Sequence, residues 1–451
     1  MKVPQTVFRE YDLRGIAGKE LTSDFAFRLG RAFATYLYQK NLKKEVVIGH
    51  DNRATSPLLT ESLIMGLQKS GANVTFIGEV PTPVFYFSNH KYTFPAGIMV
   101  TASHNPPEYN GFKLVVNRKS IFGPQIQEVR KIMEEGAFPE GDGLFSQREV
   151  LSEYLASLQN ALRLHRKVKV VVDCGNGTAG PTAVAALTRI GAEVIPLYCE
   201  SDHTFPHHLP DPVVPENMAD LISAVRESRA ELGIGIDGDG DRIGLCDNQG
   251  NLIWGDKILA LLAEEVLAEN PGAWVIFDVK CSLVLEEEIK RLGGKPLMWK
   301  TGHSLIEDKM HQVKAPVAGE LSGHLYFQDH WYGFDDAIYS AGRVLQYLSR
   351  KKETLSELIA RLKPFFATPE IRMEVPDEKK FKIVELLKER LLDNRYKVVT
   401  IDGVKVYFDD GWGLVRASNT QPALVLRFEA TTEERAKEIQ KFLTDLLHSF
   451  I

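Results

Sequence analysis

An alternating run of aspartates, Asp237-Gly238-Asp239-Gly240-Asp241-Arg242, follows the apolar segment LGIGI. Residues two apart in an extended chain face the same side, so three carboxylates would repel one another unless a cation lies between them. The glycines allow the backbone to curl around such an ion, and oxygen ligands favour Mg²⁺ or Ca²⁺ over zinc. An EF-hand is excluded because Arg242 and Asn248 stand where that loop needs Gly and Glu. The run predicts a divalent cation site that shares a phosphate with Arg242, and the alternative is a solvated acidic turn.

A second polar loop, Thr101-Ala102-Ser103-His104-Asn105-Pro106, follows the apolar segment AGIMV. A loop after a buried strand lies at the carboxyl edge of a sheet, where open α/β sheets bind ligands. The loop lacks the two glycines of a hydrolase nucleophile elbow, which disfavours acyl transfer. Lys113 lies downstream on a strand that returns towards Ser103. A hydroxyl-rich turn without function remains the alternative.

Two further loops carry groups that bind polar ligands. Gly319-Glu320-Leu321-Ser322-Gly323-His324 combines acceptors and donors on a bare backbone, which suits the hydroxyls of a sugar. Arg416-Ala417-Ser418-Asn419-Thr420-Gln421-Pro422 combines a guanidinium, hydroxyls and an amide, which suits a phosphate without a metal. A plain turn and a surface hairpin are the respective alternatives. Taken together, the four loops predict a sugar phosphate bound in a cleft between domains.

The elements that position these loops form a repeated pattern. Three segments begin with an apolar strand that ends at Asp51, Asp173 or Asp278, continue through a helix and end in a second strand. This alternation predicts three similar α/β domains with mixed, largely parallel sheets. After Pro369 the pattern changes to short strands joined at Asp-Gly pairs and to amphipathic helices, which predicts a smaller C-terminal α+β domain. The predicted domains are 1–150, 151–250, 251–366 and 367–451, with the active site in the central cleft between them.

Length and composition limit the class of protein. The chain has 451 residues, a net charge of −6 and 44% hydrophobic residues, so it can bury several cores. The mildly acidic balance argues against a nucleic-acid or anionic lipid surface. It has no apolar run long enough to cross a membrane, and its four cysteines form no metal-binding or disulfide pattern. Its first residues carry charges where a signal peptide needs an apolar run, so we expect no export. We therefore expect a cytoplasmic protein without membrane or nucleic-acid partners. No nucleotide-binding motif is present.

The four loops resemble the signature loops of the α-D-phosphohexomutase superfamily. TASHNP, DGDGDR, GELSGH and RASNTQP match them in order and over essentially the whole chain. The run GHLYFQDHWYGFDDAIYS, the early EYDLRG and KTGHS at 300–304 are most similar to the bacterial phosphomannomutase/phosphoglucomutase branch. Leu321 stands where that branch usually has Met and where phosphoglucosamine mutases typically have Gln.

The resemblance implies a mechanism and a set of site residues. Ser103 would carry a phosphoryl group, and the metal ligands for one Mg²⁺ would be Asp237, Asp239, Asp241 and Ser103 itself. The phosphoryl group would pass to C1 or C6 of a hexose phosphate through a hexose 1,6-bisphosphate that serves as intermediate and activator. Catalytic groups implied are His104, Lys113 and Arg242 around the phosphoserine and His324 beside the substrate, with Lys113 and His324 as the candidates for the general acid/base. Residues implied to bind substrate are Tyr11, Arg14, Lys280, His303, Glu320, Leu321, Ser322, Gly323, His324, Arg416, Ser418, Asn419 and Thr420.

The resulting prediction is a monomeric phosphohexomutase, an intramolecular phosphotransferase that acts on mannose or glucose phosphates. Three alternatives stay open. A phosphoglucosamine mutase would use the same loops on another sugar, and a Mg²⁺-dependent sugar phosphatase would use the same aspartates but release phosphate. A non-catalytic sugar-phosphate binding protein would not need Ser103 together with the aspartates.

Overall fold

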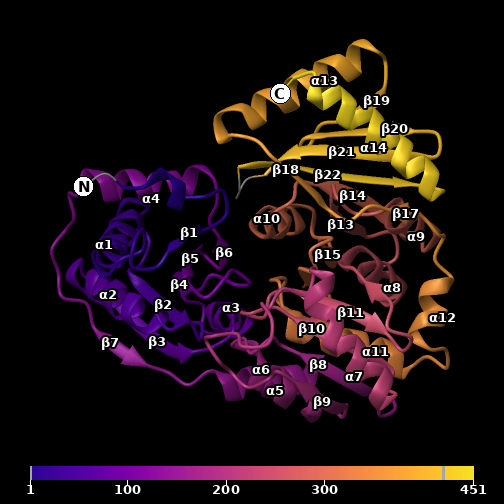
Figure 1. The fold of residues 1–451 in the computed structure, drawn as a ribbon. Helices are drawn as coiled ribbons and strands as arrows, with labels where there is room; N and C mark the ends of the chain where they lie inside the picture. Colours follow the sequence, from indigo (N-terminus) through magenta and orange to yellow (C-terminus); the bar gives the residue numbers. More distant parts are fainter. Residues whose placement is uncertain (1–2, 419–421, 451) are drawn as a thin grey trace.

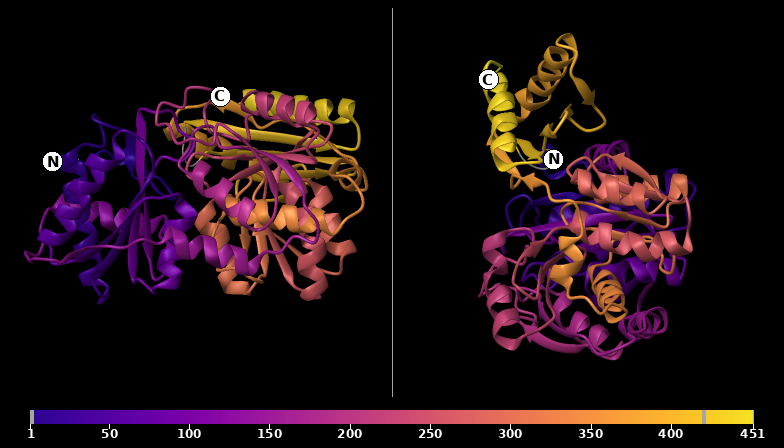
Figure 2. Two further views of the ribbon diagram at one scale, coloured as in Figure 1. Left: turned by 90° about the horizontal axis from the view of Figure 1, so that it is seen from below. Right: turned by 90° about the vertical axis from the view of Figure 1, so that its right-hand side faces the viewer.

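The computed structural model describes residues 3–418 and 422–450, which form four β-sheets flanked by helices (Figure 1). We call the parts of the chain that carry these sheets domains I to IV, in chain order. The four domains surround a common centre, with domain IV packed over domain III (Figures 1 and 2). Three mixed sheets followed by one antiparallel sheet confirm the predicted fold class. The predicted domain boundaries stay a prediction.

Domain I contains a seven-stranded sheet with the order β1-β5-β4-β2-β3-β7, and β6 pairs with β5. Alternate residues of β2 face two different cores: Val46 and Ile48 pack with α1 and α2, whereas Val47 packs with α3. Burial on both faces explains why this strand reads as a continuous apolar run. The strands are β1 (Leu13–Ile16), β2 (Glu45–His50), β3 (Asn73–Glu79), β4 (Ala96–Val100), β5 (Tyr109–Val116), β6 (Lys119–Ser120) and β7 (Phe145–Gln147). The helices are η1 (Gln5–Val7), α1 (Ser23–Gln39), α2 (Ser56–Lys69), α3 (Thr82–Lys91) and α4 (Pro124–Glu135).

Domain II contains a five-stranded sheet with the order β12-β11-β10-β8-β9. The strands are β8 (Lys169–Asp173), β9 (Glu193–Leu197), β10 (Leu232–Ile236), β11 (Ile243–Asp247) and β12 (Leu252–Ile253). The helices are α5 (Leu151–Ala161), α6 (Ala179–Arg189), η2 (Pro215–Met218) and α7 (Ala219–Ser228). Strands β8, β9 and β10 run parallel, and β11 returns antiparallel to β10.

Domain III contains a four-stranded sheet with the order β14-β13-β15-β16. The strands are β13 (Trp274–Asp278), β14 (Lys295–Trp299), β15 (Val317–Gly319) and β16 (Leu325–Phe327). The helices are α8 (Gly255–Glu269), α9 (Leu283–Arg291), α10 (His303–Val313), α11 (Ala337–Ser349) and α12 (Leu355–Ala360). Helix α11 packs against both α6 and α8, so domains II and III share one continuous core.

Domain IV is antiparallel throughout, with the order β17-β22-β21-β20-β19 and with β18 paired to β22. The strands are β17 (Phe366–Ala367), β18 (Ile371–Glu374), β19 (Lys397–Val399), β20 (Val404–Phe408), β21 (Gly411–Ala417) and β22 (Ala423–Ala430). The helices are α13 (Asp377–Asp393) and α14 (Glu433–His448). The two Asp-Gly pairs lie in the hairpin turns before and after β20, as predicted. Thr432 caps α14 by accepting a hydrogen bond from the N–H of Arg435 (3.2 Å).

In each of the first three domains, a predicted loop connects a strand to the antiparallel strand beside it. The chain leaves a parallel strand at its carboxyl end and returns antiparallel beside it, from β4 to β5, from β10 to β11 and from β15 to β16. Such a return keeps both ends of the loop anchored in the sheet. In domain IV the hairpin from β21 to β22 holds the fourth loop in the same manner.

Two further features bear on the predictions from composition. Within residues 3–418 and 422–450, no helix combines the length and the apolar character needed to cross a bilayer. All four cysteines are buried and unbridged, and Cys174 Sγ and Cys199 Sγ lie 3.8 Å apart.

Candidate active site

Ser103 lies beside the aspartate run, although 134 residues separate it from Asp237 in the chain. Its hydroxyl donates a hydrogen bond to Asp237 Oδ2 at 2.6 Å. The backbone at Ser103 is left-handed (φ 51°), a conformation that an ordinary residue keeps only when its surroundings impose it. The buried Ser103 N–H donates to Thr101 Oγ1 at 2.9 Å, which helps to hold this conformation.

The aspartate loop curls around one of its own carboxylates. Asp237 Oδ1 accepts hydrogen bonds from the N–H groups of Gly240, Asp241 and Arg242 at 3.0–3.1 Å. A Cβ atom on Gly238 would lie 2.5 Å from the carbonyl oxygen of Ser103, so only glycine permits this approach of the two loops. The sequence predicted the curl, and the structure shows what it surrounds.

The three carboxylates form a buried cluster that fits a divalent cation. Oxygens of Asp237, Asp239 and Asp241 lie within 4.8 Å of one another. Asp239 Oδ1 and Asp241 Oδ1 are buried and accept no hydrogen bond from the described residues. Burial, together with the charges of the other two aspartates, raises the pKa of Asp237 well above its ordinary value. Buried acceptors with excess negative charge match the oxygen ligands that Mg²⁺ binds.

Lys113 is the cation that faces this cluster in the structure. It lies on β5, and its Nζ forms an ion pair with Asp241 Oδ2 and lies 3.6 Å from Asp239 Oδ2. Burial lowers the pKa of Lys113, but the two aspartates outweigh burial and hold the pKa well above its ordinary value. Lys113 therefore keeps its proton while the carboxylates are charged.

His104 and Arg242 flank the serine on its other side. His104 Nδ1 lies 3.0 Å from Ser103 Oγ, and Arg242 Nε donates to Asp237 Oδ2 at 3.2 Å. Burial, followed by the nearby arginines, holds the pKa of His104 well below its ordinary value, so the ring is neutral. Asp211 lies behind both residues, 3.2 Å from Arg242 Nη2 and 4.0 Å from His104 Nε2.

The third loop meets the aspartate loop through His324. His324 Nε2 lies 3.6 Å from Asp241 Oδ1, whereas His324 Nδ1 lies 3.0 Å from Glu320 Oε2 and 2.9 Å from Ser322 Oγ. Glu320 also accepts the N–H of Gly302 at 2.5 Å. Burial raises the pKa of Glu320, but His324, Lys280 and the Gly302 N–H together outweigh burial, and the pKa falls to about 2. A charged carboxylate thus orients one ring nitrogen and leaves the other facing the cluster.

Three residues, Leu321, Gly323 and Asp335, lie next to Glu320 and His324. Leu321 is half-buried and its N–H donates to Asp278 Oδ1 at 3.2 Å. Gly323 (φ 89°) has no room for a side chain, because a Cβ atom there would lie 2.0 Å from the carbonyl oxygen of Ile243. Asp335 Oδ2 lies 3.9 Å from His324 Nε2. The loop therefore packs its backbone against β11 and turns the His324 side chain towards the aspartates.

Residues of domains I and III continue the site away from the cluster. The Tyr11 hydroxyl donates to the carbonyl oxygen of Thr301 at 2.6 Å, and the Tyr11 ring packs on His303 with centroids 6.0 Å apart. The His303 ring lies 6.1 Å from that of His324. Arg14 Nη1 donates to Asn105 Oδ1 in the serine loop at 2.8 Å.

Lys280 and Arg416 lie where domains III and IV meet. Lys280 Nζ lies 3.3 Å from Glu370 Oε2 and 3.7 Å from Asp278 Oδ2. Arg416 Nε donates to Asp402 Oδ2 at 3.0 Å, and the same oxygen accepts the N–H of Thr301 at 3.0 Å. Asn419 and Thr420, which the sequence also predicts in this loop, lie outside the described residues.

A series of contacts connects all four predicted loops. From Ser103 it passes through Asp237 and Asp241 to His324, then through His303 and Tyr11 to Thr301, and finally through Asp402 to Arg416. The sequence pattern predicts no role in the site for Asp211, Asp335, Asp402 or Glu370. Asp402 lies in an Asp-Gly turn and Asp211 in a proline-rich segment, so neither carries a local signal for a partner this distant.

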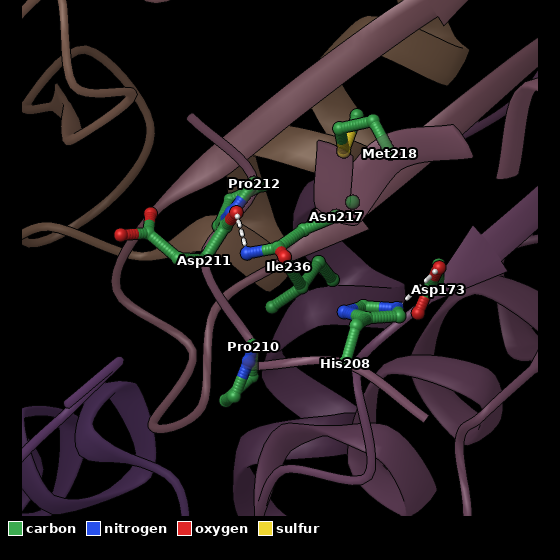
Figure 3. Close-up of a pocket in the computed structure, with 9 residues that line it drawn as sticks. Asp173, His208, Pro210, Asp211, Pro212, Asn217, Met218 and Ile236 are labelled. Carbon is green, nitrogen blue, oxygen red and sulfur yellow. Dashed lines mark hydrogen bonds and ion pairs between the residues drawn. The ribbon is translucent and has the colours of Figure 1, made fainter. Parts of the chain in front are cut away.

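A small cavity beneath residues 208–218 is separate from this site (Figure 3). Its volume of about 10 Å³ leaves room for one water molecule and excludes a hexose. His208 Nε2 lies 3.1 Å from Asp173 Oδ2 at one side of the cavity, and Asn217 donates to the carbonyl oxygen of Asp211 at the other. The Asp211 carboxylate points away from the cavity (Figure 3).

Comparisons with known proteins agree with this arrangement. Models of the phosphoglucomutase/phosphomannomutase α/β/α domains I, II and III match residues 5–140, 152–250 and 254–365, and the model of the C-terminal domain matches residues 370–446. A phosphomannomutase/phosphoglucomutase of Pseudomonas putida is 44% identical over 446 residues, which cover 99% of this chain and 96% of the relative. A phosphoglucomutase of Neisseria gonorrhoeae is 40% identical over 451 residues, which cover 99% of this chain and 98% of the relative.

Solved structures show the same relationship. The crystal structure of a phosphoglucomutase/phosphomannomutase family protein from Burkholderia thailandensis superposes with a TM-score of 0.93 at 41% identity, covering 99% of this chain and 98% of that chain. Matched models over all four domains and relatives of this similarity establish the family. The chain belongs to the phosphoglucomutase/phosphomannomutase family of the α-D-phosphohexomutase superfamily.

Proposed function

We propose that the protein interconverts the 1-phosphates and 6-phosphates of mannose and glucose through a phosphoryl group carried by Ser103. The observation that carries the assignment of Ser103 is its hydrogen bond of 2.6 Å to Asp237 in the aspartate cluster. A serine in this position has its oxygen beside the charges that a bound cation would neutralise. The full-length similarity to mutases of both sugars supports the reaction and the substrate class.

The cofactor in this proposal is one Mg²⁺ ion. Asp237, Asp239 and Asp241 would hold it together with an oxygen of phosphorylated Ser103. The two buried aspartate oxygens without a partner among the described residues support this ligand set. When bound, Mg²⁺ supplies positive charge against the phosphoryl oxygens, which lowers the barrier to phosphoryl transfer.

The transfer itself needs a proton acceptor near the sugar hydroxyl. As that hydroxyl oxygen attacks phosphorus, the bond from phosphorus to Ser103 Oγ breaks, and the hydroxyl proton must leave. We assign its acceptance to His324 Nε2, because Glu320 orients the other ring nitrogen. Lys113, which pairs with Asp241, serves as positive charge beside the cluster. In the return step the second phosphoryl group of the hexose 1,6-bisphosphate passes to Ser103.

The remaining groups bind the substrate. Glu320 and Ser322 would hold sugar hydroxyls in both orientations of the bisphosphate, and Lys280 and His303 border the same region. The predicted phosphate loop binds the phosphate that does not react, through Arg416, Ser418, Asn419 and Thr420. Arg242 and His104 would contact the phosphoryl group on Ser103, and Tyr11 and Arg14 connect domain I to the substrate region.

The test combines a mass measurement with two assays. Intact-mass analysis is expected to show one added phosphoryl group on the purified chain, and Ser103→Ala is expected to lack it and to lose turnover by orders of magnitude. An active Ser103→Ala variant would refute the serine-linked intermediate. Release of inorganic phosphate in place of isomer formation would identify a phosphatase instead, and preference for glucosamine 1-phosphate would identify the third sugar specificity. A monomer in the cytoplasm stays a prediction, which sedimentation of the purified protein and fractionation of cells can test.

A further inference from the structure

Arg53 is one of the most deeply buried charged side chains of the molecule, with 1% of its surface exposed. It follows β2 at the carboxyl edge of the sheet of domain I, three residues after His50. The ring of Phe205 from domain II lies 5.3 Å from its guanidinium carbon. Burial of a guanidinium is costly unless all of its donors are satisfied, so its partners indicate what it does.

The guanidinium of Arg53 donates to the backbone of the serine loop. Nη2 donates to the carbonyl oxygens of Ser103 (2.8 Å) and Asn105 (2.6 Å), and Nη1 donates to those of Pro106 (2.6 Å) and Tyr109 (3.0 Å). These partners lie 50 to 56 residues away in the chain. Four carbonyl groups of one loop are therefore turned towards a single cation.

Asp51 is the partner of the remaining N–H group of the Arg53 guanidinium. Asp51 Oδ2 accepts the fifth donor, Arg53 Nε, at 3.2 Å and also the N–H of Ala102 at 3.3 Å. Asp51 Oδ1 accepts the hydroxyl of Ser56 at 2.5 Å. The guanidinium thus uses all five donors in a planar fork, a geometry that lysine cannot reproduce.

The direction of these bonds fixes the reactive hydroxyl. Ser103 is held at both ends of its residue: its carbonyl oxygen accepts from Arg53, its backbone is left-handed (φ 51°), and its Oγ donates to Asp237. Gly238 packs directly against the same carbonyl, so a rotation of this peptide would collide with the aspartate loop. The position of Oγ relative to the cluster depends on the carbonyl that Arg53 holds.

We infer that Arg53 is a positioning residue for phosphoryl transfer: it fixes the backbone of residues 103–109 and thereby orients Ser103 Oγ towards the aspartate cluster. This inference rests on the proposed role of Ser103. Arg53 donates to loop carbonyls and not to the substrate region described above, so its loss is expected to slow the transfer step and to leave substrate affinity nearly unchanged.

The variant Arg53→Lys tests the inference, because it keeps a cation but loses the fork. The matched control is Arg343→Lys, since Arg343 is also buried (4% exposed), pairs with Asp329 and lies in domain III outside the site. Each protein is phosphorylated with glucose 1,6-bisphosphate and mixed with glucose 1-phosphate, and loss of the phosphoryl group from Ser103 is followed by rapid quench and intact mass.

We expect the transfer rate of Arg53→Lys to fall about 100-fold with KM for glucose 1-phosphate within about threefold of the parent. Arg343→Lys is expected to keep the parental transfer rate, even if its thermal midpoint falls as far as that of Arg53→Lys. A folded Arg53→Lys protein that transfers at the parental rate, or that changes only KM, would overturn the inference. A parent that never carries or transfers a phosphoryl group would refute the proposed function instead.

A second variant decides the matter if Arg53→Lys does not accumulate as folded protein. Asp51→Asn keeps Arg53 in the chain but removes the charge that accepts Arg53 Nε and the Ala102 N–H. A slower transfer with an unchanged KM would support the inference, and an unchanged transfer rate would overturn it.

Discussion

Asp402 Oδ2 accepts a hydrogen bond from Arg416 Nε at 3.0 Å, and the same oxygen accepts the N–H of Thr301 at 3.0 Å. One carboxylate therefore orients the guanidinium of the proposed phosphate loop and joins it to the backbone of domain III. A mutase must bind the same substrate in two orientations, so a fixed grip on the non-reacting phosphate is needed in both. The placement of Arg416 by a residue outside its own loop leads to the first prediction.

We expect Asp402→Ala to raise KM for glucose 1-phosphate about tenfold, because a charge-assisted hydrogen bond contributes about 1.5–3 kcal/mol. Steady-state kinetics over a range of glucose 1-phosphate concentrations measure the change. Asp410→Ala is the control, since Asp410 lies in the next Asp-Gly turn and pairs with Arg435 at a half-exposed position. Equal KM values for the parent and Asp402→Ala would remove Asp402 from the site.

The second prediction concerns the cation. Asp239→Asn removes one negative charge from the cluster, so both turnover and the stabilisation by Mg²⁺ are expected to fall. In the parent, Mg²⁺ at 100 times its Kd stabilises the folded state by about 2.7 kcal/mol, which raises the thermal midpoint. Asp173→Asn is the control, because Asp173 is also a buried carboxylate at a strand end of domain II but pairs with His208. A parental Mg²⁺ response in Asp239→Asn would contradict the proposed ligand set.

The third prediction concerns the approach of the two loops. Gly238→Ala places a methyl group 2.5 Å from the Ser103 carbonyl, so the serine loop must move and turnover is expected to fall about 100-fold. Gly233→Ala serves as a control, because the atoms nearest to its methyl group belong to core side chains of Cys246, Val225 and Leu221. That variant is expected to lower the thermal midpoint and to keep kcat. The prediction fails if Gly238→Ala retains parental kcat.

The fourth prediction concerns pH. Glu307 of α10 accepts the N–H of Ser120 from β6 at 3.4 Å, between domains III and I. Burial raises the pKa of Glu307 to about 7, so the folded state favours the protonated acid. This contribution to stability is fully present below the unfolded pKa near 4.5, and it is lost as pH rises through about 7.

Glu307→Gln removes this titration and is therefore expected to be more stable than the parent above pH 7, by at most about 3 kcal/mol, and similar to it near pH 4.5. Thermal midpoints of both proteins across that range measure the difference. Asp308→Asn is the control, because Asp308 is a partly exposed neighbour that pairs with Lys119. A constant difference between Glu307→Gln and the parent at all pH values would contradict the assignment.

The sequence predicted the fold class and the four loops because both leave local signals. Strands such as the one ending at Asp173 are apolar on both faces, and the loops that follow them change abruptly to polar residues. The amphipathic helices predicted after Pro369 are local in the same way, and α14 begins with a Thr432 cap. Lys113 was expected to return towards Ser103, and the structure pairs it with Asp241 across two domains.

Residues whose role depends on distant contacts left no such signal. Arg53 lies in an ordinary strand-to-helix turn. Its four carbonyl partners are 50 to 56 residues away in the chain, so only the folded structure reveals them. In the sequence, Asp402 looks like any aspartate of a hairpin turn. Its partner Thr301 is 101 residues away, so no local pattern connects the two. Backbone carbonyls and amides have no residue type of their own, so a pattern of side chains cannot reveal which of them a buried charge will bind.

The peptide groups of Thr301 offer a final consequence. Tyr11 of domain I binds its carbonyl oxygen and Asp402 of domain IV binds its N–H, so three domains converge on main-chain atoms. Evolutionary drift at position 301 can change the side chain without dissolving this junction, and among the common amino acids proline alone lacks the N–H that the junction uses. Position 301 can therefore vary among related sequences although its main-chain atoms join three domains of the enzyme.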